Sequence, residues 1–193
     1  MNIDRRDNMA NENSSKRIFI LSQRICGGSV GDLCGQILRL NAEDNDQESK
    51  LSNFTREPIH IYIDSFGGSA YDMWALIDVI ESLNTPVYTY CVGSSMSAAF
   101  MIFLAGEKRF IGRHATLMYH QLSTWQTGKL QDILDNIDEA QRVQNSMEEY
   151  IKERTGLTDS ELSEWRNSKI DVYFTPDDAV KRGIATDILA RAS

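Results

Sequence analysis

The sequence is poor in several residue types, and each shortage excludes something. Its 193 residues include three prolines, three histidines and three cysteines, and 20 Lys and Arg stand against 28 Asp and Glu. The resulting net charge of −8 argues against binding to nucleic acid or to anionic membranes. The cysteines lack metal-ligand spacing and suit a reducing compartment, so we expect a cytoplasmic protein with no metal site. No apolar run reaches the roughly 20 residues that cross a bilayer.

What remains is enough for one core, since 41% of the residues are hydrophobic. Residues 1–16 are polar, which predicts a flexible N-terminal arm before a single domain over 17–193. Residues 59–64 alternate as a strand and lead through two glycines into an apolar-faced helix, and a second strand follows over 86–92. This strand–helix–strand unit predicts an α/β domain with a parallel sheet.

Further elements are read from periodicity and capping signals. We expect a helix over 30–41, a surface loop over 43–50, and strands over 115–119 and 171–174. A long amphipathic helix is predicted over 129–154. Thr158 with Glu161 indicates a capping box, and Thr175 before Pro176 indicates the start of the last helix.

A possible nucleophile lies at one strand-to-helix junction. Three serines, Ser94, Ser95 and Ser97, precede the apolar run over 98–105, and Gly93 is expected to allow a tight turn before them. The free N–H groups of the helix's first turn would stabilise the oxyanion formed when a serine attacks a carbonyl. A small-residue packing site is the alternative, and these residues alone allow any of the three serines.

A serine needs a base to take its proton, and the chain offers three histidines. His60 lies inside a predicted strand, which favours a structural role, and His114 lies in a turn beside Arg113. His120 ends a strand directly before a polar loop, where the active-site residues of parallel sheets gather. His120 is therefore the best candidate for the base.

The acid that would orient this base is less certain. Asp171 heads an apolar strand, so its carboxylate could be held against an imidazole, but Asp64 and Asp187 are rivals on the same grounds. Gly67 and Gly68 follow a buried strand and would let backbone N–H groups approach a ligand, although such a pair is more often only a turn.

Four motifs in the same order and at similar intervals resemble those of the proteolytic subunit of Clp protease, over nearly the whole chain from Arg17 to Leu189. They are Ser-Phe-Gly-Gly at 65–68, Cys-Val-Gly-Ser-Ser-Met-Ser-Ala at 91–98, Met-Tyr-His-Gln at 118–121 and Asp-Val-Tyr-Phe-Thr at 171–175. The resemblance implies a crotonase-like fold of repeated ββα units with a parallel sheet core, from which the helix over 129–154 projects as a handle.

The resemblance also assigns roles that spacing leaves open. It implies a catalytic triad of Ser97, His120 and Asp171, and an oxyanion hole at the N–H groups of Gly68 and Ala98, with Gly67 in the same turn. The sequence departs from the family pattern at Phe66, Met96, Ala98 and Ile170. Phe66 stands where the family has a turn proline, so the Gly67-Gly68 loop is expected to be less rigid.

The function implied is that of a serine endopeptidase acting on unfolded polypeptides inside a chamber. Two stacked heptameric rings and an AAA+ Clp ATPase are the implied partners, with no metal or organic cofactor. The alternatives are a catalytically silent ring subunit that scaffolds an active one, and a crotonase-like acyl-CoA hydratase or isomerase. The presence of serine, histidine and aspartate at all three motif positions favours the peptidase.

Overall fold

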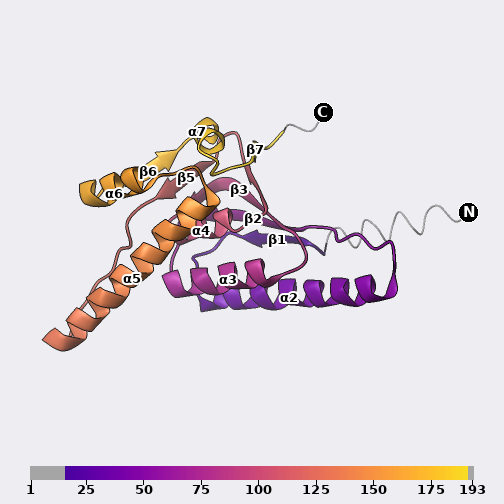
Figure 1. Ribbon diagram of the computed structural model, residues 1–193, viewed down its shortest axis with the longest axis horizontal. Helices are drawn as coiled ribbons and strands as arrows, with labels where there is room; N and C mark the ends of the chain where they lie inside the picture. The colour runs from indigo at the N-terminus through magenta and orange to yellow at the C-terminus, as the bar shows by residue number, and fades with distance from the viewer. Residues whose placement is uncertain (1–15, 191–193) are drawn as a thin grey trace, which may run out of the picture.

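The structure is a computed structural model that describes residues 16–190, so the predicted N-terminal arm lies outside the described residues except for Lys16. Strands and helices alternate along most of the chain (Figure 1). In order they are β1 (Ile18–Leu21), α2 (Gly27–Lys50), β2 (Ile59–Ser65), α3 (Ala70–Ser82), β3 (Val87–Met96), α4 (Ala98–Leu104), β4 (Lys108–Ile111), β5 (Thr116–Tyr119), α5 (Leu130–Arg154), α6 (Asp159–Ser168), β6 (Val172–Phe174), α7 (Pro176–Lys181) and β7 (Asp187–Ile188).

The strands form one seven-stranded sheet organised around β3. Its main path runs β1-β2-β3-β4-β7, and every neighbouring pair on that path is parallel. The first half of β3 pairs with β4, whereas its last three residues pair with β5, which in turn pairs antiparallel with β6. The predicted mixed α/β fold with a parallel sheet core is therefore confirmed.

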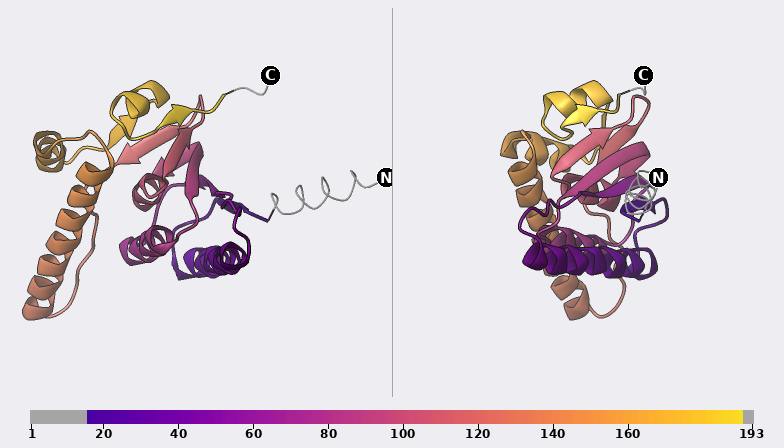
Figure 2. Two further views of the ribbon diagram at one scale, coloured as in Figure 1. Left: turned by 45° about the vertical axis from the view of Figure 1, so that its right-hand side comes forward. Right: turned by 90° about the vertical axis from the view of Figure 1, so that its right-hand side faces the viewer.

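The helices lie at different depths in the molecule. Helices α2 and α3 lie side by side against it, and all seven residues of α4 are buried (Figure 1). Helix α5 instead extends away from the body (Figure 2). The segment between β5 and α5 leads outward beside this helix, which then returns to the body. The predicted long helix is thus confirmed. Among residues 16–190, no helix has the length and apolar character needed to span a bilayer.

Several local predictions are confirmed by capping geometry. The Thr158 hydroxyl accepts from the Glu161 N–H, and the Glu161 carboxylate accepts from the Thr158 N–H, as a capping box requires. The Thr175 hydroxyl accepts from the Asp178 N–H and caps α7, whose first residue is Pro176.

The prediction of a tight turn at Gly93 is wrong. Strand β3 continues through Gly93 to Met96, and the chain turns only at Ser97. Gly93 has a φ of 85°, and a Cβ on it would lie 2.6 Å from Oδ1 of Asp64. The glycine therefore serves close packing inside the strand and does not reverse the chain.

The predicted loop over 43–50 is also wrong, because α2 continues to Lys50. Asp44 is 2% exposed and accepts hydrogen bonds from Arg17, at 3.0 Å from Nη1, and from the Thr85 hydroxyl at 2.7 Å. These partners come from the chain entering β1 and from the turn before β3. A polar stretch in the sequence thus stays helical because its aspartate has buried partners on two other segments.

We predict that Asp44→Asn lowers the free energy of unfolding by about 3–5 kcal/mol at neutral pH, because it leaves the Arg17 guanidinium buried without a counter-charge. Burial by itself raises the pKa of the Asp44 carboxyl, but the hydrogen bonds from Arg17 and Thr85 outweigh it, so the net pKa lies below 3.8. The difference between wild type and variant should therefore persist down to that pH and shrink as the pH falls further. Urea denaturation at several pH values measures it.

The matched control is Asp46→Asn, which removes an exposed ion pair with Lys50 on the same helix. It should cost no more than about 0.5 kcal/mol. Equal losses for the two variants would show that the buried pair does not hold α2 in place.

Candidate active site

Three strand ends meet where β3, β5 and β6 finish or begin. Met96 of β3 pairs with Met118 of β5, and the backbone N–H of Ser97 donates to the Met118 carbonyl at 2.9 Å. On the other side of β5, Tyr119 pairs with Val172 in the antiparallel register with β6. Continuing that register by one residue sets His120 opposite Asp171. Ser97 and His120 therefore directly follow two neighbouring strands, and Asp171 directly precedes the third, so the three predicted catalytic residues lie at the same end of these strands.

Ser97 has a strained backbone. Its φ of 55° and ψ of −123° are unusual for a residue with a side chain, and it stands between β3 and α4 without a capping hydrogen bond from its hydroxyl. Strain of this kind is characteristic of a nucleophile held on a sharp strand-to-helix turn. The half-buried Ser97 side chain is thus presented at the turn itself.

The other two serines of the stretch are used differently. The Ser94 hydroxyl donates to Oδ1 of Asp64 at 3.1 Å, and the Ser94 N–H donates to the same oxygen at 3.0 Å. Ser95 is fully buried, and its hydroxyl has no hydrogen-bond partner among the described residues. Neither serine lines the cavity that contains Ser97.

That cavity has a volume of about 110 Å³ and combines polar and apolar walls. It is lined by Gly68, Ala70, Met73, Ser97, Ala98, His120, Leu122, Ser123 and Met147. A hydroxyl and an imidazole that the sequence separates by 23 positions thus face the same small space. The methionines and Leu122 give the space an apolar lining suited to a side chain of moderate size.

The imidazole of His120 has a defined tautomer. Its Nδ1 lies 2.5 Å from the carbonyl oxygen of Gln121, which can only accept, so Nδ1 carries the hydrogen. In the neutral ring Nε2 then holds the lone pair, as a general base requires. Asp171 is exposed, and within residues 16–190 its carboxylate makes no hydrogen bond to His120 despite the matching register. The structure therefore brings Ser97 and His120 into one cavity and leaves Asp171 beside them.

The turn formed by Gly67 and Gly68 packs against Ser97. A Cβ on Gly67 would lie 2.7 Å from the Cβ of Ser97 and 3.0 Å from the Ala98 nitrogen, and Gly67 has a φ of 100°. Both values require glycine there. A Cβ on Gly68 would lie 2.1 Å from the carbonyl oxygen of Ile25, which is packed against the other side of the turn.

Hydrogen bonds to Ile25 fix this turn. The Ile25 N–H donates to the Gly67 carbonyl and the Ile25 carbonyl accepts from the Ser69 N–H, both at 2.9 Å. The N–H of Gly68 has no acceptor among the described residues. Ala98 begins α4, so its N–H lacks a helical acceptor as well. Two residues with free backbone N–H donors, Gly68 and Ala98, thus line the same cavity as Ser97.

The rival residues have other partners. Nδ1 of His60 lies 2.8 Å from the Tyr90 hydroxyl, and burial lowers the pKa of this imidazole, while His114 lies in an exposed turn. Asp64 accepts from Ser94, and Asp187 pairs with Phe110 in β7 at the far edge of the sheet. Within residues 16–190 no three His, Cys, Asp or Glu side chains gather closely enough to hold a metal ion.

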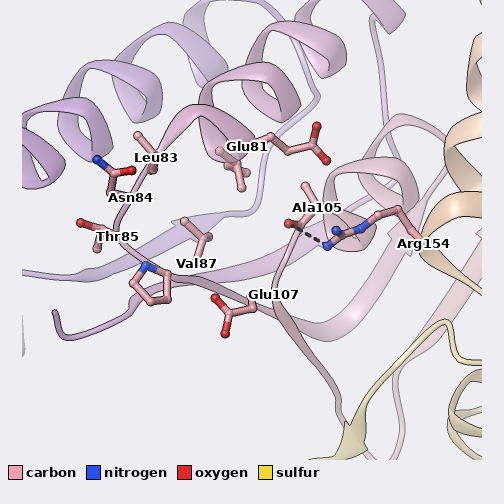
Figure 3. A pocket seen from close by; sticks show the side chains of 10 residues that line it. Glu81, Leu83, Asn84, Thr85, Val87, Ala105, Glu107 and Arg154 are labelled. Carbon is pink, nitrogen blue, oxygen red and sulfur yellow. Dashed lines mark hydrogen bonds between the residues drawn. The ribbon is translucent and has the colours of Figure 1, made fainter. Parts of the chain in front are cut away.

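A second cavity, of about 360 Å³, lies where β3 begins, at the opposite end of that strand from Ser97 (Figure 3). Two of its charged side chains, Glu81 and Arg154, have structural partners. Glu81 accepts from the Tyr150 hydroxyl at 2.8 Å, and the Arg154 guanidinium donates to the carbonyls that end α4, among them that of Ala105. These contacts tie α5 to the body of the domain.

Comparison with known proteins identifies the family. The family model described as Clp protease matches residues 3–192. The chain belongs to the Clp protease family. It is similar to the ATP-dependent Clp protease proteolytic subunit 4 of Rhodococcus jostii, with 32% identity over 91% of this chain and 86% of the relative. Proteolytic subunit 3 of Frankia casuarinae is 30% identical over 90% of this chain and 77% of its own, and subunit 1 of Prochlorococcus marinus strain MIT 9312 is 29% identical over 90% and 84%.

The family model covers almost the whole of this Clp protease chain, so the family predicted from four short motifs is confirmed. Two residues that shape its candidate site were not singled out from the sequence. Ile25 holds the glycine turn through hydrogen bonds of its backbone, and backbone contacts cannot be predicted from the type of side chain. Ser65 also holds the glycine turn, through its hydroxyl, which accepts from the Gly67 N–H. A serine two residues before a glycine often forms such a turn, so the sequence did contain a signal for this contact.

Proposed function

We propose that this chain is a serine endopeptidase of the Clp type that cleaves unfolded polypeptides. The observation that supports this most is the shared cavity, which is lined by the strained Ser97, by His120 and by Gly68 and Ala98, whose backbone N–H groups have no acceptor among the described residues. Serine, imidazole and a pair of amide donors around one reacting position are what acyl transfer from a peptide requires.

In the proposed mechanism, Ser97 Oγ attacks the scissile carbonyl carbon while Nε2 of His120 takes the hydroxyl proton. The negative charge that develops on the carbonyl oxygen is stabilised by the N–H groups of Gly68 and Ala98. His120 then returns the proton to the leaving amine as the C–N bond breaks. Water, deprotonated by the same imidazole, releases the acyl group from Ser97 and regenerates the hydroxyl.

Asp171 is the proposed acid that stabilises the His120 imidazolium. Directly opposite residues in an antiparallel pair have their Cα atoms about 4.5–5.5 Å apart. If the register of β5 and β6 continues by one residue, Asp171 lies at that distance from His120, and we propose that its side chain rotates to reach Nδ1. Its carboxylate would replace the Gln121 carbonyl as the acceptor. This exchange gives the proposed triad its third member without a change of fold.

We also propose that the chain works as a ring-forming subunit together with a Clp ATPase. The relatives are named proteolytic subunits of an ATP-dependent protease, which supports an assembly of several chains that uses ATP. The projecting half of α5 supports assembly. Leu130 is 74% exposed, and Leu134 and Ile137 on the same stripe are about half exposed. An apolar stripe of this kind on an extended helix is suited to burial against another subunit.

We expect a fluorophosphonate probe to label Ser97, because the cavity supplies both the base and the oxyanion donors for attack on phosphorus. Peptide mapping by mass spectrometry identifies the modified residue. Ser97→Ala should abolish labelling and peptide hydrolysis, whereas Ser94→Ala and Ser95→Ala should both be labelled. Probe incorporation that survives Ser97→Ala would end the assignment, and absent hydrolysis by the wild-type chain would favour a silent scaffolding subunit.

For the proposed acid, Asp171→Asn should lower kcat by about 10⁴-fold, since an amide cannot stabilise the imidazolium. Asp64→Asn and Asp187→Asn serve as matched controls and should keep wild-type turnover in the same fluorogenic peptide assay. A large loss in either control, with Asp171→Asn active, would transfer the acid's role to the rival carboxylate.

For assembly, native mass spectrometry of the wild-type chain should show two stacked heptameric rings. A charged residue in the apolar stripe, Leu134→Asp, should shift the population to single rings or monomers, because the carboxylate would be buried on assembly. Asp135→Asn, at the next residue of the same helix, should leave the mass unchanged. A wild-type monomer at micromolar concentration would contradict the ring proposal.

A further inference from the structure

Ser65 connects three parts of the chain around the glycine turn. It is the last residue of β2 and is 3% exposed. Its hydroxyl donates to the Gln23 carbonyl at 2.6 Å and accepts from the Gly67 N–H at 3.2 Å. A hydroxyl that both donates and accepts has its hydrogen and its lone pair directed, and a strong donor bond makes it a better acceptor.

The two bonds that reach Gly67 restrain the peptide units on either side of it, because its N–H belongs to the Phe66–Gly67 unit and its carbonyl to the Gly67–Gly68 unit. Ser65 holds the Gly67 N–H in a local turn, and Ile25 holds the Gly67 carbonyl. Because a trans peptide is planar, its C=O and N–H point in opposite directions. With the Gly67 oxygen directed at Ile25, the Gly68 N–H is directed away from Ile25, and Gly68 lines the cavity of Ser97 and His120.

The residue between Ser65 and the glycines does not restrain the turn. Phe66 is 78% exposed, and among the described residues its N–H makes no hydrogen bond. Glycines at 67 and 68 are the least restrained residues available. The rigidity of the turn therefore depends on hydrogen bonds from outside it, and Ser65 supplies the one that comes from a side chain.

We propose that Ser65 is a positioning residue that aligns the Gly68 N–H for the oxyanion. The proposal rests on the proposed peptidase function. Without the hydroxyl, the Gly67 N–H and the Gln23 carbonyl both lose a partner, and the Phe66–Gly67 peptide gains freedom to rotate. Only the bond from Ile25 then restrains the Gly67–Gly68 peptide, so the direction of the Gly68 N–H is less well fixed. The donor is then misaligned mainly in the transition state, where its hydrogen bond is strongest, so kcat falls while KM changes little.

The test compares Ser65→Ala with Ser65→Thr, which keeps the hydroxyl. Ser65→Ala should lower kcat for a fluorogenic peptide by about tenfold or more, short of the roughly 100- to 1,000-fold that loss of a donor itself costs. The affinity for a peptide boronate, whose tetrahedral adduct places an oxygen in the oxyanion position, should fall by the same factor as kcat. Binding of a product peptide should not change, and Ser65→Thr should recover most of both losses.

Ser69→Ala is the matched structural control. The Ser69 hydroxyl accepts from the Asp72 N–H and caps α3 on the other side of the glycines, so its loss should lower the melting temperature without weakening boronate binding selectively. A second-site variant gives an independent readout. Phe66→Pro fixes φ within the turn and removes no hydrogen bond, so it should restore part of the kcat lost in Ser65→Ala.

Unchanged kcat in a folded Ser65→Ala variant would overturn the proposal, as would a loss that leaves boronate affinity at the wild-type value. If Ser65→Ala does not fold, the Ser65→Ala/Phe66→Pro double variant and Ser65→Thr are measured instead. For each of them the fold loss of kcat is again compared with the fold loss of affinity for the peptide boronate. Wild-type hydrolysis that requires Ser97 is established first. Its absence would refute the peptidase function, whereas its presence with indifferent Ser65 variants would refute only the role of Ser65.

Discussion

The divided pairing of β3 is the constraint on which the site depends. Its first half pairs with β4 and its end with β5, and the hydrogen bond from the Ser97 N–H to the Met118 carbonyl extends this pairing beyond the strand. Side chains in a strand alternate between faces, so a slip of one residue would direct Ser97 away from the cavity. The antiparallel register of β5 with β6 ends at the pair Tyr119 and Val172, directly after which lies His120 on one strand and directly before which lies Asp171 on the other. Register therefore positions all three side chains.

A second constraint acts on the backbone donors. The glycine turn is held between Ile25 on one side and the Ser97–Ala98 peptide on the other, with too little room for a Cβ at either glycine. The proposed oxyanion donors are thus placed by close packing of backbone against backbone, whereas Ser97 and His120, the proposed nucleophile and base, are placed by strand pairing. An enzyme that relies on preorganised dipoles needs this kind of support, because reorganisation during the reaction would consume the stabilisation they provide.

Sequence reasoning succeeded where the signal is local and failed where a distant partner decides. The periodicity of α5 and the capping residues Thr158 and Thr175 fix their elements from neighbouring positions. The helical state of residues 43–50 depends on Arg17, which is 27 positions from Asp44, and nothing near Asp44 indicates it. Glycine is typical of turns, yet Gly93 lies inside β3, where it packs closely against Asp64. Likewise, the sequence alone does not distinguish Ser94, Ser95 and Ser97 as candidate nucleophiles, because the hydrogen-bond partners of Ser94 and Ser97 lie on other segments.

The position of Asp171 follows from the same physics. With a neutral ring, the Gln121 carbonyl satisfies Nδ1 at no cost in desolvation, and an exposed carboxylate gains little by replacing it. Once His120 has taken the Ser97 proton, the bond to a carboxylate becomes charge-assisted and about twice as strong as a neutral one. The balance then shifts toward Asp171 as the imidazolium forms. In the proposed mechanism the acid therefore acts mainly in the transition state, where its contribution accelerates the reaction and does not merely bind the ground state.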